Sequence, residues 1–385
     1  MLIHTVKEGE TLAGIAKEYD TTKERIAENN YIYKDVCQGR ELLILTPTRS
    51  YKVKAGDTPS ELSRRFGVRM ERLLMNNPSL QDGIYVGQEL AIKYPVPQMG
   101  AVTLNGYCYG MGVEKLRRLL PFLTYVTVSA YRIEKRGLSR LWWDKEIVRL
   151  GKEHGKIMLL RARDNSDGKE YENANYRGEL IKSLIATAKT GGYSGITLSC
   201  HGLKSNTELL LEFIKELKNA MTGSGLVLFT ETDENVTSEA IEISDGGIFS
   251  YDKACFEKIL PFSDAEAKIF KNLAKEATAA KIFIDLPSAV FGDFIKPKGI
   301  EEIFNLGKRC VIIPDEVALI CECELGGGTG KFTSLKNIKA RLDFASKLGF
   351  GGVSVDVDTA PREYFMLIYS LFAPVHLYTP FSLPI

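Results

Sequence analysis

Acidic side chains stand at the ends of several apolar runs in the second half of this 385-residue chain. Glu231 and Asp233 follow LVLFT, Asp285 ends KIFID, and Asp356 and Asp358 follow GGVSV. Two carboxyl groups about 5–9 Å apart can serve as the acid and the base or nucleophile of a hydrolysis. These residues therefore raise acid–base hydrolysis as a hypothesis. The alternative is that they pair with basic side chains or cap helices, and the sequence leaves both open.

The elements that must position these acids are short strands alternating with amphipathic helices. The apolar, β-rich runs after Gly100 are AVTLNGYCY, LTYVTVSAYRI, KIMLLRA, SGITLSC, GLVLFTE, GGIFSYD, KIFIDLP and GGVSVDVD. This alternation predicts an α/β fold, a (β/α)8 TIM barrel, with its site at the carboxyl ends of the strands. The stretch RCVIIPDEVALICECELG predicts extra strands in a small α+β insertion at about residues 293–335.

The residues that end the predicted strands are the candidates for a site at the barrel mouth. They are Tyr107, Tyr131, Arg161, Ser199, His201, Glu231, Tyr251, Asp252, Asp285, Asp356 and Asp358. Among them, a histidine with an ordinary pKa near 6.5 could exchange a proton at neutral pH.

Two copies of one pattern occupy the first hundred residues. The first reads HTVKEGETLAGIAKEYDTTKERIAENN and then QGRELLIL, and the second reads YKVKAGDTPSELSRRFGVRMERLLMNN and then GQELAIK. The spacing of apolar residues predicts a strand, two helices and a second strand in each copy. Thr11 and Thr58 stand where a hydroxyl would cap the first helix, next to Glu10 and Asp57.

This pattern resembles the LysM module, a βααβ unit that binds glycans containing N-acetylglucosamine. The resemblance implies a sugar groove in each module, between the loop after the first strand and the loop before the last. The residues implicated are Gly9, Glu10, Thr11, Asn30, Tyr31 and Ile32 in the first copy, and Gly56, Asp57, Thr58, Asn77, Pro78, Ser79 and Leu80 in the second. The other interpretation is that the threonines and asparagines only cap helices and turns.

The sequence predicts one module over residues 1–47, a second over 50–94, a linker over 95–100 and a barrel over 101–385. The linker falls in YPVPQMG, whose two prolines and glycine interrupt regular structure. We expect such a linker to let the two modules move relative to the barrel.

The order of the barrel runs is similar to that of family 18 glycoside hydrolases, in particular the bacterial spore-cortex-lytic N-acetylglucosaminidases, which pair LysM modules with this barrel. In that family the sugar's own acetamido oxygen attacks the anomeric carbon, and a glutamic acid at the end of the fourth strand protonates the leaving oxygen. The family pattern Asp-Gly-x-x-x-Asp-x-Glu falls here on Ser194, Gly195, Ser199 and His201. The resemblance therefore implies a barrel whose three catalytic carboxylates are absent.

Two further positions bear on the same resemblance. The family's Met-x-Tyr-Asp segment corresponds to Phe249 to Asp252, so Tyr251 and Asp252 are possible remnants of the site. The tryptophan that usually ends the last strand is replaced by Asp356. We expect the sugar-stacking platform to be missing.

Two functions follow as hypotheses. The first is a protein that binds peptidoglycan or another N-acetylglucosamine polymer, associated with spore or cell wall, with a catalytically degenerate barrel. The second is an active peptidoglycan N-acetylglucosaminidase that hydrolyses spore cortex with non-standard acids. Expected partners are the glycan itself and spore-coat or cortex proteins.

Composition limits the other classes. With 50 basic and 49 acidic residues, the net charge of +1 gives no electrostatic basis for binding nucleic acid or an anionic membrane. The start, MLIHTVKEGETL, predicts no Sec signal peptide, which fits the spore cortex or coat as well as the cytoplasm. No cofactor or metal is expected, and the C-x-C of Cys321 and Cys323 predicts structural cysteines on a strand.

Overall fold

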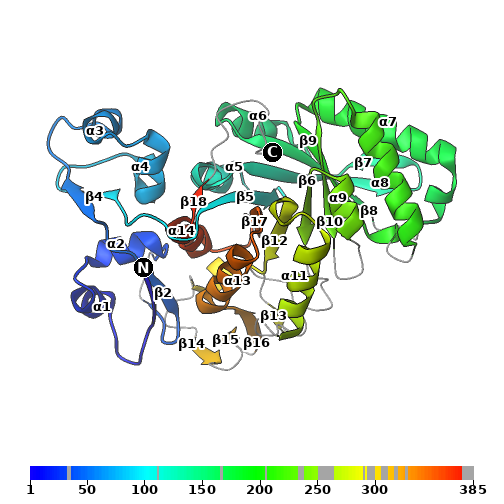
Figure 1. Ribbon diagram of the computed structural model, residues 1–385. Coiled ribbons are helices and arrows are strands. Elements are labelled where there is room, and N and C mark those ends of the chain that lie inside the picture. Colours follow the sequence, from blue (N-terminus) through cyan, green and yellow to red (C-terminus); the bar gives the residue numbers. More distant parts are fainter. Residues whose placement is uncertain are drawn as a thin grey trace.

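The protein is a (β/α)8 barrel with an α+β insertion, preceded by two βααβ modules, as the sequence predicts (Figure 1). The computed structural model describes residues 1–32, 36–110, 112–164, 168–203, 206–232, 238–249, 264–288, 291–292, 300–304, 311–315, 320–325 and 328–374.

Each module closes a small core between two helices and a two-stranded antiparallel sheet. The first comprises β1 (Leu2–Thr5), α1 (Leu12–Glu18), α2 (Lys23–Asn29) and β2 (Glu41–Ile44). The second comprises β3 (Arg49–Lys52), α3 (Pro59–Phe66), α4 (Met70–Asn76), the 3-10 helix η1 (Pro78–Asp82) and β4 (Glu89–Lys93). Pro59 begins α3, where its missing N–H costs no hydrogen bond.

The barrel consists of eight parallel strands, and the last strand pairs with the first. In order around the barrel they are β5 (Ala101–Cys108), β6 (Tyr125–Glu134), β8 (Ile157–Asp164), β9 (Gly195–Cys200), β10 (Val227–Thr232), β11 (Gly246–Phe249), β12 (Ile282–Leu286) and β17 (Gly352–Asp356). The short β7 (Gly137–Arg140) pairs antiparallel with β6, and β18 (Ala373–Pro374) lies beside β5.

Helices follow the strands and surround the barrel (Figure 1). The α-helices are α5 (Val113–Leu119), α6 (Lys145–Glu153), α7 (Ala174–Gly191), α8 (Thr207–Met221), α9 (Ser238–Ile243), α11 (Asp264–Glu276), α13 (Leu335–Lys347) and α14 (Arg362–Leu371). The 3-10 helices are η2 (Leu120–Phe122), η3 (Lys169–Glu172), η4 (His201–Leu203) and η5 (Ala279–Lys281).

Aromatic side chains fill the barrel interior. Tyr107, Tyr125, Phe229 and Phe283 belong to one buried cluster, together with aliphatic side chains of β8 and β11. The rings fit because some strands begin with glycine: a Cβ at Gly352 would lie 2.1 Å from the Phe283 ring. The interior is therefore packed rather than hollow, as in other barrels of this size.

The insertion between β12 and α13 contains an antiparallel sheet, again as expected. Its elements are β13 (Phe291–Gly292), α12 (Ile300–Phe304), β14 (Val311–Asp315), β15 (Ile320–Leu325) and β16 (Gly328–Thr333), with strand order β13-β16-β15-β14. Cys321 and Cys323 lie on β15, the strand that their alternation predicts.

The two modules are docked on the barrel, through contacts that the linker sequence does not reveal. Helix α14 is buried almost all round, because the modules cover the side that the barrel leaves open. Arg40 of the first module forms an ion pair with Glu363 of α14, and both side chains are at most 3% exposed. In the second module, Arg72 donates to the Tyr369 hydroxyl at 2.6 Å.

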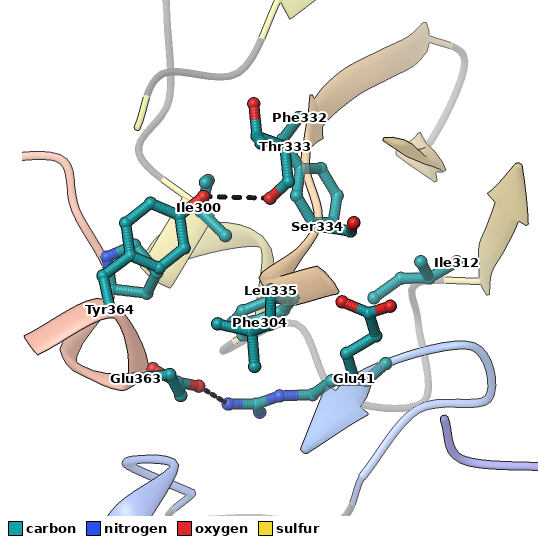
Figure 2. A pocket seen from close by; sticks show the side chains of 12 residues that line it. Glu41, Ile300, Phe304, Ile312, Phe332, Thr333, Ser334, Leu335, Glu363 and Tyr364 are labelled. Atoms are coloured by element: carbon teal, nitrogen blue, oxygen red, sulfur yellow. Dashed lines mark hydrogen bonds and ion pairs between the residues drawn. The ribbon is translucent and has the colours of Figure 1, made fainter. Parts of the chain in front are cut away.

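Figure 2 shows the junction where β2, α14 and the insertion meet. Glu363 and Tyr364 of α14 face Phe304 of α12 and Thr333 of β16 around a cavity of about 10 Å³. This volume holds about one water molecule, so the junction is a packing interface and not a ligand site. The Arg40 guanidinium stacks on the Phe304 ring at 4.1 Å, which ties the insertion to the first module.

Candidate functional site

Strand β9 brings only part of the predicted catalytic pattern to the barrel mouth. Ser199 is buried near the carboxyl end of β9. Ser194 lies before the amino end of the strand, where its N–H donates to the Met158 carbonyl oxygen at 2.8 Å. His201 begins η4, but its side chain lies outside the described residues, and so do Asp233, Tyr251 and Asp252.

An ion pair at the mouth holds the carboxylate of Glu231. Arg161 of β8 donates from Nε and Nη2 to the two carboxylate oxygens at 2.5 and 2.6 Å. Both side chains are 7% exposed. The Tyr107 hydroxyl donates to the same carboxylate at 2.7 Å, and Arg161 also donates to the Ser129 hydroxyl at 3.1 Å. This bidentate geometry is typical of a fixed, structural pair.

The pKa values of two acids at the barrel mouth, Glu231 and Asp285, shift in opposite directions. Burial alone would raise the pKa of Glu231. The positive charge of Arg161 and the hydrogen bonds donated to the Glu231 carboxylate outweigh burial and lower this pKa below its usual range. The pKa of Asp285 on β12 is well above its usual range, because the group is desolvated and faces the negative charges of Glu231 and Asp356. Glu231 is therefore ionised at neutral pH, whereas Asp285 keeps its proton to a higher pH than an ordinary carboxyl group does.

The acids after β17 shape the turn that follows the strand. Asp356 accepts a hydrogen bond from the Asp358 N–H at 2.8 Å, and Asp358 accepts one from the Tyr109 N–H at 2.6 Å. Burial raises the pKa of Asp356. The strand-end Tyr131 instead points to Arg140, whose Nη2 donates to its hydroxyl at 2.8 Å.

The mouth therefore contains one fixed anion, Glu231, and one acid with a raised pKa, Asp285. Glu231 is ionised and has no proton to donate, and taking one up would weaken its ion pair with Arg161. Asp285 could donate a proton. Within the described part of the chain, no group of three or more histidine, cysteine or acidic side chains could hold a metal ion.

In each module, the predicted site residues in the loop after the first strand, here called the first loop, form hydrogen bonds with the backbone of the same module. The Thr11 and Thr58 hydroxyls accept hydrogen bonds from the N–H groups of Gly14 and Glu61, both at 3.2 Å. These threonines are the helix caps that the sequence predicts. Gly9 and Gly56 both have positive φ, 76° and 87°, in the turn just before.

The acids of the first loops close the same turns. Glu10 accepts from the Lys7 N–H at 2.7 Å and contacts His4, and Asp57 accepts from the Lys54 N–H at 2.8 Å. These backbone hydrogen bonds lower the pKa of each carboxyl group. The polar atoms of the first loops are therefore engaged inside their own modules.

Asn30 and Asn77 form the same connection in both copies. Each side chain is fully buried; it donates to a helix carbonyl and to a strand carbonyl, and it accepts from the strand N–H of Leu43 or Ala91 at 2.6 Å. This arrangement locks the second helix to the last strand. Leu80 is also buried in the module core, so these three residues do not face solvent.

The other predicted residues of the loops before the last strands do meet in a groove. Tyr31, Ile32, Pro78 and Ser79 line a cavity of about 490 Å³ between the two modules. The rest of its lining was not predicted from the sequence, and it includes Tyr85 on the second module and two barrel arginines, Arg118 of α5 and Arg362 of α14. No local pattern marks these arginines, because docking alone brings α5 and α14 beside the modules.

Comparison with known families identifies the modules. The LysM domain model matches residues 4–36 and 51–93. The chain is 32% identical to the cell wall-binding protein YocH of Bacillus subtilis over 106 residues. This match covers 26% of this chain and 37% of YocH. Over 101 residues the chain is 32% identical to the probable peptidoglycan endopeptidase LytE of Bacillus subtilis, covering 23% of this chain and 30% of LytE. The chain thus spans about a third of the length of these relatives.

Solved structures cover the whole molecule. The spore cortex-lytic enzymes SleL of Bacillus cereus and Bacillus megaterium superpose with TM-scores of 0.71 and 0.72, at 17% identity, over 97% of this chain and 98% of each of theirs. A chitinase from Chromobacterium violaceum matches 70% of this chain and 98% of its own, with a TM-score of 0.60 and 15% identity. The chain therefore contains two LysM domains, followed by a barrel with the fold of SleL and of these chitinases.

Proposed function

We propose that this protein binds peptidoglycan or a related N-acetylglucosamine polymer through its LysM domains, and that its barrel does not hydrolyse the glycan. The LysM pair supports the binding role, as does the sequence similarity to a cell wall-binding protein. A spore or cell-wall location is part of the proposal, because the fold is that of spore cortex-lytic enzymes.

The observation that carries the proposal is the state of the barrel mouth. In the family 18 pattern, an aspartic acid is expected at the position of Ser199 on β9. A hydroxyl cannot carry the negative charge with which that aspartate would stabilise a developing cation. The neighbouring Glu231 is held by Arg161. Removal of a general acid typically costs about 10²–10⁴-fold in rate, and the lost electrostatic stabilisation adds to this.

A second candidate function rests on Asp285. A desolvated carboxyl group whose pKa is well above its usual range keeps its proton to a higher pH, as a general acid requires. An active N-acetylglucosaminidase would then use Asp285 as the acid, with Asp356 as the second carboxyl group.

The test uses the purified full chain and purified spore-cortex peptidoglycan. Co-sedimentation measures binding, and reducing ends together with muropeptide masses measure cleavage. We expect binding that N-acetylglucosamine oligomers compete away, and no products above a protein-free blank. Product release that Asp285→Asn abolishes would establish the enzyme instead, and failure to co-sediment would refute the binding role.

Point variants are preferable to deletion of the LysM domains in this test. The domains contribute Leu43, Leu45 and Met75 to the same core as the barrel. Their removal would expose that core, so a loss of binding could reflect misfolding.

A further inference from the structure

The groove between the LysM domains is bounded by three parts of the molecule. The first domain contributes α2 and Tyr31, the second contributes Ser79 and Tyr85, and the barrel contributes Arg118 and Arg362. Its volume of about 490 Å³ falls within the roughly 300–1,000 Å³ of typical small-molecule sites. Neither LysM domain alone forms this groove.

Hydrogen bonds between the two domains set the groove's width. Glu28 of α2 accepts from the Ser79 N–H at 3.1 Å and from its hydroxyl at 2.6 Å. Arg25 donates to the Asn77 side-chain oxygen at 3.1 Å and to the Glu89 carbonyl oxygen at 2.8 Å. A groove already held in one shape loses less conformational entropy on binding.

The barrel holds both sides of the groove through one arginine. Arg118 donates to the Tyr31 hydroxyl at 3.0 Å and to the Asp82 carboxylate at 3.1 Å. The Arg362 guanidinium lies 5.3 Å from the Tyr31 ring centre. Tyr31 itself has a positive φ of 52°, which is uncommon for a residue other than glycine and indicates a position fixed by its surroundings.

The groove presents chemistry suited to an uncharged, amide-bearing sugar. Tyr85 is 67% exposed at the groove and offers a ring face for the apolar side of a pyranose. Next to it, the Gln88 side chain donates to the Ser79 hydroxyl at 3.3 Å, so both groups lie together as polar partners for hydroxyl and acetamido groups. Acidic and basic side chains line the groove in equal number, which favours a neutral ligand over an ion.

We propose that one oligosaccharide of N-acetylglucosamine binds along this groove and contacts both LysM domains, so that the chain has one composite site instead of one site per domain. The inference rests on the proposed glycan-binding function and assigns its location. It agrees with the first loops, whose polar atoms already bind their own domains. Tyr85 is the stacking residue, and Ser79 and Gln88 are the polar contacts.

The test is calorimetric titration of the full chain with the N-acetylglucosamine hexamer. We expect one binding site per chain. Tyr85→Ala should weaken binding at least about tenfold, Tyr85→Phe should retain it, and Ser79→Trp, which fills the groove, should abolish it. The matched controls are Thr11→Ala and Thr58→Ala in the first loops, with folding checked by circular dichroism, and they should bind like the wild type.

Three other results would separate the composite groove from the proposed glycan-binding function. Two sites per chain, or a loss confined to the threonine variants, would overturn the composite groove and leave the proposed glycan-binding function intact. Binding to peptidoglycan without binding to the hexamer would overturn the assigned ligand class. Failure of the wild type to bind either would refute the proposed function together with the inference.

Discussion

The barrel mouth and the groove between the LysM domains both contain ionisable residues, yet they use them differently. At the mouth, Glu231 and Arg161 are each 7% exposed and satisfy one another. At the groove, Asp82 is 61% exposed although it pairs with Arg118, and Tyr85 is 67% exposed. The mouth uses its charges to hold the barrel together, whereas the groove keeps polar and aromatic surface in contact with solvent. An acid at a strand end is thus weak support for catalysis until its partner is known.

The largest expected effect is at the mouth. Arg161→Ala leaves the buried Glu231 carboxylate without its counter-charge, which should lower the free energy of unfolding by about 3–5 kcal/mol. Urea denaturation followed by circular dichroism measures this. The control is Arg149→Ala, since Arg149 forms an exposed pair with Glu153 and should cost at most about 1 kcal/mol. Equal effects of the two variants would contradict the structural role of the mouth pair.

A double variant tests whether the ion pair at the mouth contributes to stability through charge or through packing. Arg161→Met combined with Glu231→Leu removes both charges together, so it should recover most of the stability lost in Arg161→Ala. If the double variant is as unstable as the single one, the pair contributes through packing instead of charge.

The next effect concerns the docking that forms the groove. Arg40→Ala removes the partner of buried Glu363 at the LysM–barrel junction, with an expected cost of about 3 kcal/mol. Proteolysis near residues 94–100 should also accelerate, because the first domain is released from α14. An unchanged digestion pattern together with unchanged stability would mean that the domains are held independently of this pair.

A smaller effect separates capping from glycan contact in the first loops. Thr58→Ala removes the hydrogen bond to the Glu61 N–H and should cost about 1 kcal/mol of stability. Thermal unfolding in the presence and absence of the hexamer measures both roles at once. We expect a lower midpoint and an unchanged shift on adding ligand; a smaller shift would make Thr58 a contact residue.

The smallest effect is a change in pH dependence at Asp285. Its pKa in the folded protein is raised, so the stability it contributes is complete below its unfolded pKa and is lost as pH rises through the folded pKa. Asp285→Asn removes this loss. Relative to wild type, the variant should become progressively more stable as the pH rises above about 3.9, the usual pKa of an unfolded aspartic acid. Denaturation at several pH values tests this, and a difference independent of pH would show that Asp285 is not protonated in the fold.

In the part of the chain that the structure describes, no helix is both long and apolar enough to cross a bilayer.

Much of the fold could be predicted from local sequence. The eight apolar runs became the eight barrel strands, and RCVIIPDEVALICECELG became β14 and β15. Thr11 and Thr58 were recognisable as caps, because a cap depends on residues only three positions away. The docking of the modules on the barrel could not be predicted, because the prolines of the linker describe the backbone locally and carry no information on what covers α14.

The candidate sites depended on contacts that no local pattern contains. The sequence by itself determined the two LysM domains, the barrel and the serines on the β9 segment, since each follows from periodicity or motif. Tertiary structure alone decided that Arg161 neutralises Glu231 across 70 residues and that Arg118 reaches Tyr31 across 87. The physical reason is that a charge or hydroxyl is defined by its nearest partner in space, and docking and barrel closure choose that partner.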